Sequence, residues 1–399
     1  MIKLLLLPLL LIAFASDACA KEPPPAQLAS RLTYEYLFLV EALMRHQRYD
    51  EAALELEGLL QRVAGNGYET ALVHQSFGYV EIGREMYPSA IRHFRAAVDS
   101  AQLPAEVSHQ LSYTLVQLLF QEDDAAAALQ LLIRWMKFEA KPPPRVYLLK
   151  AQIHRALDQI EAAIDDLETA IRLSDDPAEP WFQLLVGFYL DAKKTKQAVA
   201  LLSKMIVRFP ATAAYWRQLA GLQMELGRER DALATLELAH SRGQLKQREI
   251  LWLAQLYLHQ KMPQLAVQLL ATGVAEQDQK ALELLAQAWV LAREPEKALP
   301  VFDALAKLDQ SGRWELRGAE QLVELERWDE AAERLQRAVK QLKRPSYDNW
   351  VLLGAVYIRL NKFPEAQAAF TRAEPLAKGE PQRKQLVEWL GYLEHQLQR

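Results

Sequence analysis

The chain has 399 residues, of which 51% are apolar and 25% charged, so it is long and apolar enough to bury a large core. Its net charge of −4 argues against nucleic acid as the main partner, because phosphate binding needs a surplus of lysine and arginine on one face. Glycine is scarce, at 15 residues, and good helix formers such as Ala, Leu, Gln, Glu, Arg and Lys predominate. The composition therefore predicts an all-α fold.

The first twenty residues have the pattern of a secretory signal peptide. Lys3 precedes an apolar run from Leu4 to Ala15, and Ala18-Cys19-Ala20 is a small-x-small cleavage site. Twelve apolar residues are too few for a bilayer core that needs about 20. We expect cleavage after Ala20 and a mature protein without an integral membrane segment. The alternative is a lipid anchor on Cys19, which the charge of Asp17 disfavours.

Cleavage would also remove Cys19, the only cysteine of the chain. The mature protein would then have no thiol, which suits an oxidising compartment and excludes a cysteine nucleophile or a cysteine-based metal site. Residues 21–32 follow as a linker, and their three consecutive prolines favour an extended polyproline conformation.

A spaced pattern of large and small residues recurs from Thr33 onward. With Tyr347 as position 1, the residues at positions 4, 8, 11, 20 and 24 are Trp350, Gly354, Tyr357, Ala366 and Phe370. The same frame starts again at Glu179, Ala213 and Gln247, which are separated by 34 residues each. Weaker copies start near Thr33, Ala71, His109, Pro144, Gln279 and Gly312. All ten copies have an alanine at position 20.

This period and spacing resemble the tetratricopeptide repeat (TPR) family. The resemblance implies a right-handed TPR superhelix, an α-solenoid of about ten helix-turn-helix repeats over residues 33–378. Helix A and helix B of each repeat should cross closely at positions 8 and 20, where only glycine or alanine fits. Residues 379–399 should form a capping helix whose apolar stripe is Leu386, Trp389, Leu390 and Leu393.

No catalytic constellation stands out from these repeats. The eight histidines are scattered over different repeats without the spacing of a metal site, and paired acids such as Asp123-Asp124 fit turns and solvated helix faces. His154 occupies the tyrosine slot of its repeat, where core packing is the expected role. We therefore predict that the chain is not an enzyme and holds no metal or cofactor.

Function should then come from a surface. In TPR superhelices, helix A lines the concave groove mainly through positions 2, 5, 9, 12 and 13. The candidate partner-binding residues at these positions are Gln75, Tyr79, Tyr113, Gln117, Phe120, Gln121, Arg145, Gln152, Arg155, Gln183, Arg217, Met224, Gln255 and His259. Amides, rings and guanidinium groups suit an extended peptide, although the same residues are also compatible with solvated helix faces. Tyr113 and Phe120 favour the groove, because exposed aromatics outside the core slots are unusual.

Several stretches are similar to a narrower group. They include SYTLVQLLF, ALQLLIRWMK and YWRQLAGLQMELGRERDALATLELAHSRGQL. They resemble the periplasmic TPR proteins that accompany the ExbB, ExbD and TonB energy-transducing modules, and the similarity extends from about Tyr113 to Leu270. It implies a periplasmic, non-enzymatic adaptor in TonB-dependent uptake of nutrients such as iron complexes. A periplasmic scaffold for envelope assembly, in peptidoglycan synthesis or pilus and secretin biogenesis, remains an alternative.

Overall fold

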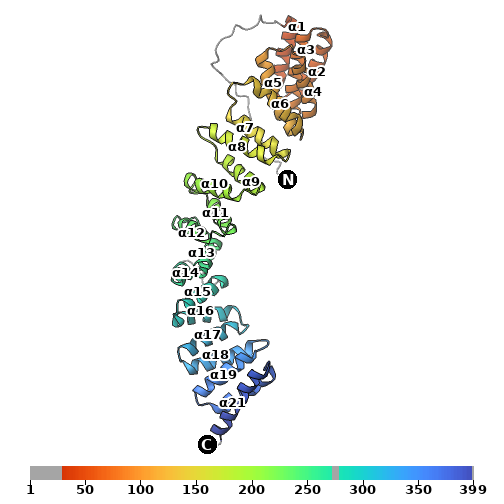
Figure 1. Cartoon of the computed structure of the whole chain (residues 1–399). Coiled ribbons are helices and arrows are strands. Elements are labelled where there is room, and N and C mark those ends of the chain that lie inside the picture. Colours follow the sequence, from red (N-terminus) through yellow and green to blue (C-terminus); the bar gives the residue numbers. More distant parts are fainter. Residues whose placement is uncertain (1–28, 272–277, 398–399) are drawn as a thin grey trace. The chain divides into compact units, whose positions relative to one another are not determined.

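The computed structural model describes residues 29–271 and 278–397. The expected signal peptide with Cys19, and all but the last four residues of the proline-rich linker, lie outside these residues. Every regular element within them is a helix, 21 α-helices and one short 3-10 helix, and none is a strand (Figure 1). None of these helices is both long and apolar enough to cross a bilayer. The prediction of an all-α solenoid is confirmed.

The chain divides into two compact units, Met1–Ala192 and Lys193–Arg399. The first contains α1 (Arg31–Arg45), α2 (Tyr49–Arg62), α3 (Gly67–Gly83), α4 (Tyr87–Asp99), α5 (Ala105–Gln121), α6 (Ala125–Phe138), α7 (Pro144–Ala156), α8 (Ile160–Leu173) and α9 (Glu179–Asp191). The second contains α10 (Thr195–Arg208), α11 (Ala213–Glu225), α12 (Glu229–Ser241), α13 (Gln247–His259), α14 (Pro263–Ala271), α15 (Gln279–Leu291), α16 (Pro295–Leu308), α17 (Arg313–Glu324), α18 (Trp328–Gln341), α19 (Tyr347–Arg359), α20 (Phe363–Ala373), η1 (Glu374–Leu376) and α21 (Glu380–Leu397).

Odd-numbered helices from α1 to α19 are the A helices of the repeats, and their starts follow the predicted frame. Six of them begin at the residue assigned to position 1, namely α7, α9, α11, α13, α15 and α19. By contrast, α3 and α5 begin four residues early, at Gly67 and Ala105. For α3 the reason is a helix cap outside the repeat signature, since the Asn66 side chain accepts a hydrogen bond from the Glu69 N–H. The order of helices is consistent with about ten repeats.

Position 20 is where the two helices of a repeat come closest. All ten alanines predicted there are fully buried: Ala52, Ala90, Ala128, Ala163, Ala198, Ala232, Ala266, Ala298, Ala331 and Ala366. Where position 8 is glycine, the phenylalanine at position 24 fills the missing volume. A methyl group on Gly354 would lie 2.7 Å from the Phe370 ring, and one on Gly78 would overlap Phe94. In these two repeats, slots 8 and 24 are therefore matched in size. The expectation that only glycine or alanine fits position 8 is wrong, because buried Val40, Val116 and Val186 occupy it in other repeats, where position 24 is leucine.

The turn between helix A and helix B has one backbone conformation throughout. In each of the ten turns, the residue at position 15 adopts a positive φ of 57° to 70°. The N–H that follows then bonds back to the end of helix A, as from Met86 to the Glu81 carbonyl at 2.8 Å and from Lys362 to the Tyr357 carbonyl at 2.9 Å. This is the Schellman arrangement. Only Gly227 is a glycine here, so the sequence did not reveal the conserved geometry of this turn.

Tyrosines at position 11 connect neighbouring repeats. The hydroxyl of Tyr189 donates to Glu168 at 2.5 Å, and that of Tyr257 donates to Glu237 at 2.9 Å. Burial and the neighbouring carboxylate raise the pKa of both phenols, so they remain protonated donors. Each bond joins position 11 of one repeat to position 25 of the repeat before it, which makes this slot more than an apolar packing position.

The C-terminal end of the second unit is covered by α21. Leu386 and Leu393 are buried, and Trp389 and Leu390 are half-buried against the last repeat. The Trp389 ring stacks on Phe370 with centroids 5.8 Å apart. The stripe expected of a capping helix therefore faces the stack.

Candidate functional site

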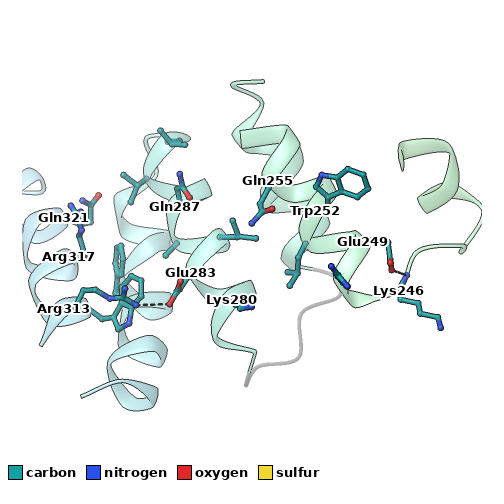
Figure 2. Close-up of a pocket in the computed structure, with 18 of the residues that line it drawn as sticks. Lys246, Glu249, Trp252, Gln255, Lys280, Glu283, Gln287, Arg313, Arg317 and Gln321 are labelled. Atoms are coloured by element: carbon teal, nitrogen blue, oxygen red, sulfur yellow. Dashed lines mark hydrogen bonds and ion pairs between the residues drawn. The ribbon is translucent and has the colours of Figure 1, made fainter. Parts of the chain in front are cut away.

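The second unit contains a groove of about 1500 Å³, and A helices of four successive repeats contribute most of its lining. It runs over α11, α13, α15 and α17, and Phe302 of α16 also lines it. Figure 2 shows Trp252 and Gln255 on α13, Gln287 on α15 and Gln321 on α17, all among the lining side chains. A surface that repeats the same helix face from one repeat to the next suits a long ligand better than a compact one.

Cationic side chains outnumber acidic side chains in the lining of the groove. Six are cationic: Arg217, Lys246, Arg248, Lys280, Arg313 and Arg317. Three are acidic: Glu249, Glu283 and Glu320. Each acid has a cationic partner, in the pairs Arg217–Glu249 at 3.1 Å, Arg313–Glu283 at 2.9 Å and Arg317–Glu320 at 2.9 Å. The groove therefore has an excess of positive charge, although the chain as a whole is negative.

The contacts of Glu249 lower the pKa of its carboxyl group. Burial raises the pKa of this carboxyl, but hydrogen bonds from Arg217 and from backbone N–H groups outweigh burial and hold the pKa below its ordinary value. Glu249 is therefore ionised at neutral pH and neutralises Arg217. Within residues 29–271 and 278–397, no carboxylate lies within 4 Å of the side-chain nitrogens of Lys246, Arg248 or Lys280.

Two buried polar atoms in the lining have no hydrogen-bond partner among the described residues. They are Nε1 of Trp314 and Oε1 of Gln321, in side chains of residues that are each only 9% exposed. An unpaired buried polar atom costs about 1–3 kcal/mol, and such atoms are uncommon in folded proteins. Both residues line the groove, although the two atoms themselves are buried beneath its surface.

Comparison with protein families decides what these helical pairs are. Models described as tetratricopeptide repeat match residues 144–177 and 316–381. The chain carries tetratricopeptide repeats. The first match begins at Pro144, the residue predicted as position 1 of its repeat and the first residue of α7. The second covers most of α17 and all of α18, α19 and α20, so it includes part of the groove lining.

Solved structures that resemble the TPR chain do so at low identity. A tetratricopeptide repeat protein from Parabacteroides merdae is 16% identical with a TM-score of 0.32, and the match covers 62% of this chain and 98% of that one. PilF of Pseudomonas aeruginosa is 17% identical with a TM-score of 0.33, covering 52% and 95%. MamA of Desulfovibrio magneticus RS-1 is 17% identical with a TM-score of 0.36, covering 41% and 94%. No curated protein sequence matches the chain.

Of the fourteen candidate residues, the TPR groove brings together two, Arg217 and Gln255. The same slots in the repeat that starts at Gln279 contribute five lining residues. They are Lys280, Glu283, Gln287, Val290 and Leu291, at positions 2, 5, 9, 12 and 13. The candidate residues named from the sequence end with the seventh repeat and so do not include these five. Met224 is half-buried against the core, and exposed His259 has its Nδ1 3.1 Å from Glu229.

The other candidates lie in the first unit and do not line this groove. Tyr79 contacts the Phe94 ring at 5.1 Å between centroids. Arg155 pairs with Asp191 at 2.9 Å and with Asp158 at 3.3 Å. Gln75 and Gln152 are half-buried, and Gln117, Gln121, Arg145 and Gln183 are exposed.

The expectation that Tyr113 and Phe120 are exposed aromatics is wrong. Both rings are half-buried, because Tyr113 packs on Trp135 with centroids 5.0 Å apart and Phe120 packs against the same core. Burial also raises the pKa of the Tyr113 phenol. Their role as binding anchors therefore lacks the observation that suggested it.

Among the described residues, the histidines form no group that resembles a metal site. No three residues of the His, Cys, Asp and Glu types are placed to hold a metal ion in the part of the chain that the structure describes. His74 and His93 do meet, with their Nδ1 atoms 3.0 Å apart and the His93 ring stacked on Phe77. Burial lowers the pKa of both imidazoles. For His93 the charges of His74 and Arg92 lower it further, and only Glu81 opposes them.

Because of the His74–His93 pair, we expect the folded protein to lose stability in acid. Because the folded pKa values lie below the usual 6.5, the unfolded chain binds more protons as the pH falls through and below 6.5. The neutral histidine pair therefore contributes its full stability above pH 6.5. That contribution should decline as the pH falls from 6.5 towards the lower pKa values of the folded state. The His74→Gln variant cannot charge at this position, so its melting temperature should fall less than that of the wild type between pH 7.5 and 5. Equal falls would show that the pair does not contribute.

Proposed function

We propose that the chain is a non-enzymatic TPR adaptor that binds an extended segment of a protein partner in the groove over α11, α13, α15 and α17. The observation that supports this most is the alignment of half-buried Trp252, the Gln255 and Gln287 amides and uncompensated cations on one surface. Amides can hydrogen-bond an extended backbone, and an aromatic ring beside them can contact a side chain. Aromatic residues and arginine are also the types that most often dominate binding energy.

We further propose that the adaptor acts in the periplasm as an accessory of TonB-dependent energy transduction and nutrient uptake. The apolar stretch and cleavage motif of residues 1–20 support secretion. The similarity of the stretch from Tyr113 to Leu270 to periplasmic TPR proteins of TonB systems supports the pathway. A lipid anchor on Cys19 is the alternative attachment, and a scaffold for peptidoglycan synthesis or pilus and secretin biogenesis is the alternative role.

A substitution that fills the groove would test the binding proposal. Gly221 lines the groove, and a side chain added there meets no atom within 4 Å, so Gly221→Leu should fill the groove without disturbing the helices. Gly187 is the matched control, because it occupies position 9 of the preceding repeat, also has open space around it and does not line this groove. Immobilised wild-type and variant proteins would be compared in capture from periplasmic and membrane extracts, with captured proteins identified by mass spectrometry.

We expect Gly221→Leu to lose the specific partner and Gly187→Leu to retain it. Trp252→Ala should weaken binding by about 30-fold, the equivalent of a 2 kcal/mol hot spot. Retention of the partner by Gly221→Leu would contradict groove binding. Identification of TonB, ExbB or ExbD among the captured proteins would support the uptake role, and peptidoglycan or pilus proteins would support the alternative. The intact mass of the secreted chain should correspond to a start at Lys21, whereas a diacylglycerol mass on Cys19 would indicate the anchor.

A further inference from the structure

The groove has an internal charge pattern that points to the chemistry of its occupant. Its three acids are each paired, whereas Lys246, Arg248 and Lys280 have no carboxylate within 4 Å among the described residues. The Asp278 carboxylate caps α15 by accepting from the backbone N–H groups of Lys280 and Ala281, and it also accepts from the Gln247 amide, but it forms no ion pair with the Lys280 side chain. A ligand with carboxylates would supply the missing charge.

These cations follow the repeat. Arg248, Lys280 and Arg313 all occupy position 2 of successive repeats, and Figure 2 shows Lys280 and Arg313 near the starts of α15 and α17. Of these three, Arg248 and Lys280 lack a carboxylate partner among the described residues, whereas Arg313 is paired with Glu283. Helices α13 and α15 are in contact, and packed helices lie about 8–10 Å apart. A polyproline II segment repeats its side chains every three residues, or about 9 Å. In a β-strand the same face recurs after two residues, or about 7 Å, which is shorter than the general spacing of packed helices.

Amides in the groove follow the same period. Gln255 and Gln287 occupy position 9 of successive repeats. A polyproline II backbone makes no hydrogen bonds to itself, so its N–H and C=O groups are available to such amides. The unpaired Nε1 of Trp314 and Oε1 of Gln321 lie in nine-tenths buried residues at the far end of the same lining, one a donor and the other an acceptor.

From these observations we infer that the groove binds an acidic partner segment in polyproline II conformation, with carboxylates at every third residue. This inference rests on the proposed function and specifies the partner. Arg248 and Lys280, the two position-2 cations without a carboxylate partner, contact successive carboxylates of the segment. The glutamine amides bond the backbone between them, and Trp252 contacts an apolar side chain of the segment.

Synthetic peptides test this spacing directly. The probe is a fluorescein-labelled, proline-rich peptide with glutamate at every third residue, measured by fluorescence anisotropy with the full secreted chain. Its isomer has the same composition with glutamate at every second residue, and its neutral analogue has glutamine at the same places. We expect the every-third peptide to bind at least tenfold more tightly than either. Equal affinity of the isomer would overturn the spacing, and equal affinity of the neutral analogue would overturn the charge.

Charge-reversal variants locate the binding site. Arg248→Glu with Lys280→Glu should weaken the every-third peptide by at least tenfold. Lys261→Glu with Lys307→Glu changes the net charge by the same amount at exposed positions outside the groove, and its affinity should equal that of the wild type. Equal losses in both double variants would show that only net charge matters and would overturn the inference.

The peptide-binding experiment and the partner-capture experiment distinguish a failure of the acidic specificity from a failure of the adaptor function. If the every-third peptide fails to bind but Gly221→Leu still abolishes capture of the partner, the acidic specificity is wrong and groove binding stands. If capture is also insensitive to Gly221→Leu, the proposed function fails as well.

Discussion

Replacement of Gly78 by alanine is expected to destabilise the second repeat by about 2 kcal/mol. The new methyl group would overlap the Phe94 ring, and Phe94 is fully buried, so the ring has no free space into which to move. Overpacking of this kind typically costs about 1–3 kcal/mol, and the better helix propensity of alanine offsets it by no more than about 1 kcal/mol. Urea unfolding would measure the loss, and hydrogen exchange would locate it.

A second substitution shows whether the slots are matched. Phe94→Leu alone should also destabilise, because it leaves a cavity. The double variant recreates the alanine and leucine found at these positions in other repeats, as in Ala220 with Leu236 and Ala254 with Leu270. Its loss should therefore be smaller than the sum of the two single losses by 1 kcal/mol or more. In a stack of repeats the faster exchange should stay near α3 and α4. Additive losses, or equally fast exchange in α19 and α20, would contradict this account.

Arg334→Met is expected to destabilise the ninth repeat by about 2–3 kcal/mol. Arg334 is only 5% exposed and forms ion pairs with Glu315 at 2.9 Å and Asp303 at 2.6 Å. The Glu315 side chain is itself only 12% exposed. Removal of one partner from a buried pair costs about 3–5 kcal/mol, because the other charge stays buried. Arg337 still contacts Glu315 at 3.0 Å, which should reduce the loss.

Two variants accompany this measurement in thermal or urea unfolding. Arg334→Met combined with Glu315→Gln removes the stranded charge and should recover much of the stability. Arg317→Met breaks an exposed pair with Glu320 and should cost less than about 1 kcal/mol. If Arg334→Met were no more harmful than Arg317→Met, burial would not be the source of the effect.

Local structure was predictable because each repeat depends on residues close in sequence. The frame from Tyr347 placed six A helices at their first residue and identified ten fully buried alanines. Helix propensity, the 34-residue period and the need for a small residue at the helix crossing are all legible in one repeat. The turn conformation at position 15 was not, because backbone hydrogen bonds impose it on Gln47, Glu85 and Lys261 as well as on Gly227.

The binding surface depended on contacts between repeats. The slots of Tyr113 and Phe120 suggested exposed rings, but the helices packed around them half-bury both. In the repeat that starts at Gln279, the residues at these slots line the groove. Which cations of the groove are neutralised depends on the carboxylates that lie beside them in the folded protein. Arg217 has Glu249 from the next repeat, 32 residues away, whereas Arg248 has no such partner among the described residues. The sequence by itself determined the helices, their pairing and the residues at their crossings, since these depend on local spacing. The tertiary structure decided which slots form a groove and which charges within it are available, because burial and ion pairing are set by side chains that successive repeats bring together.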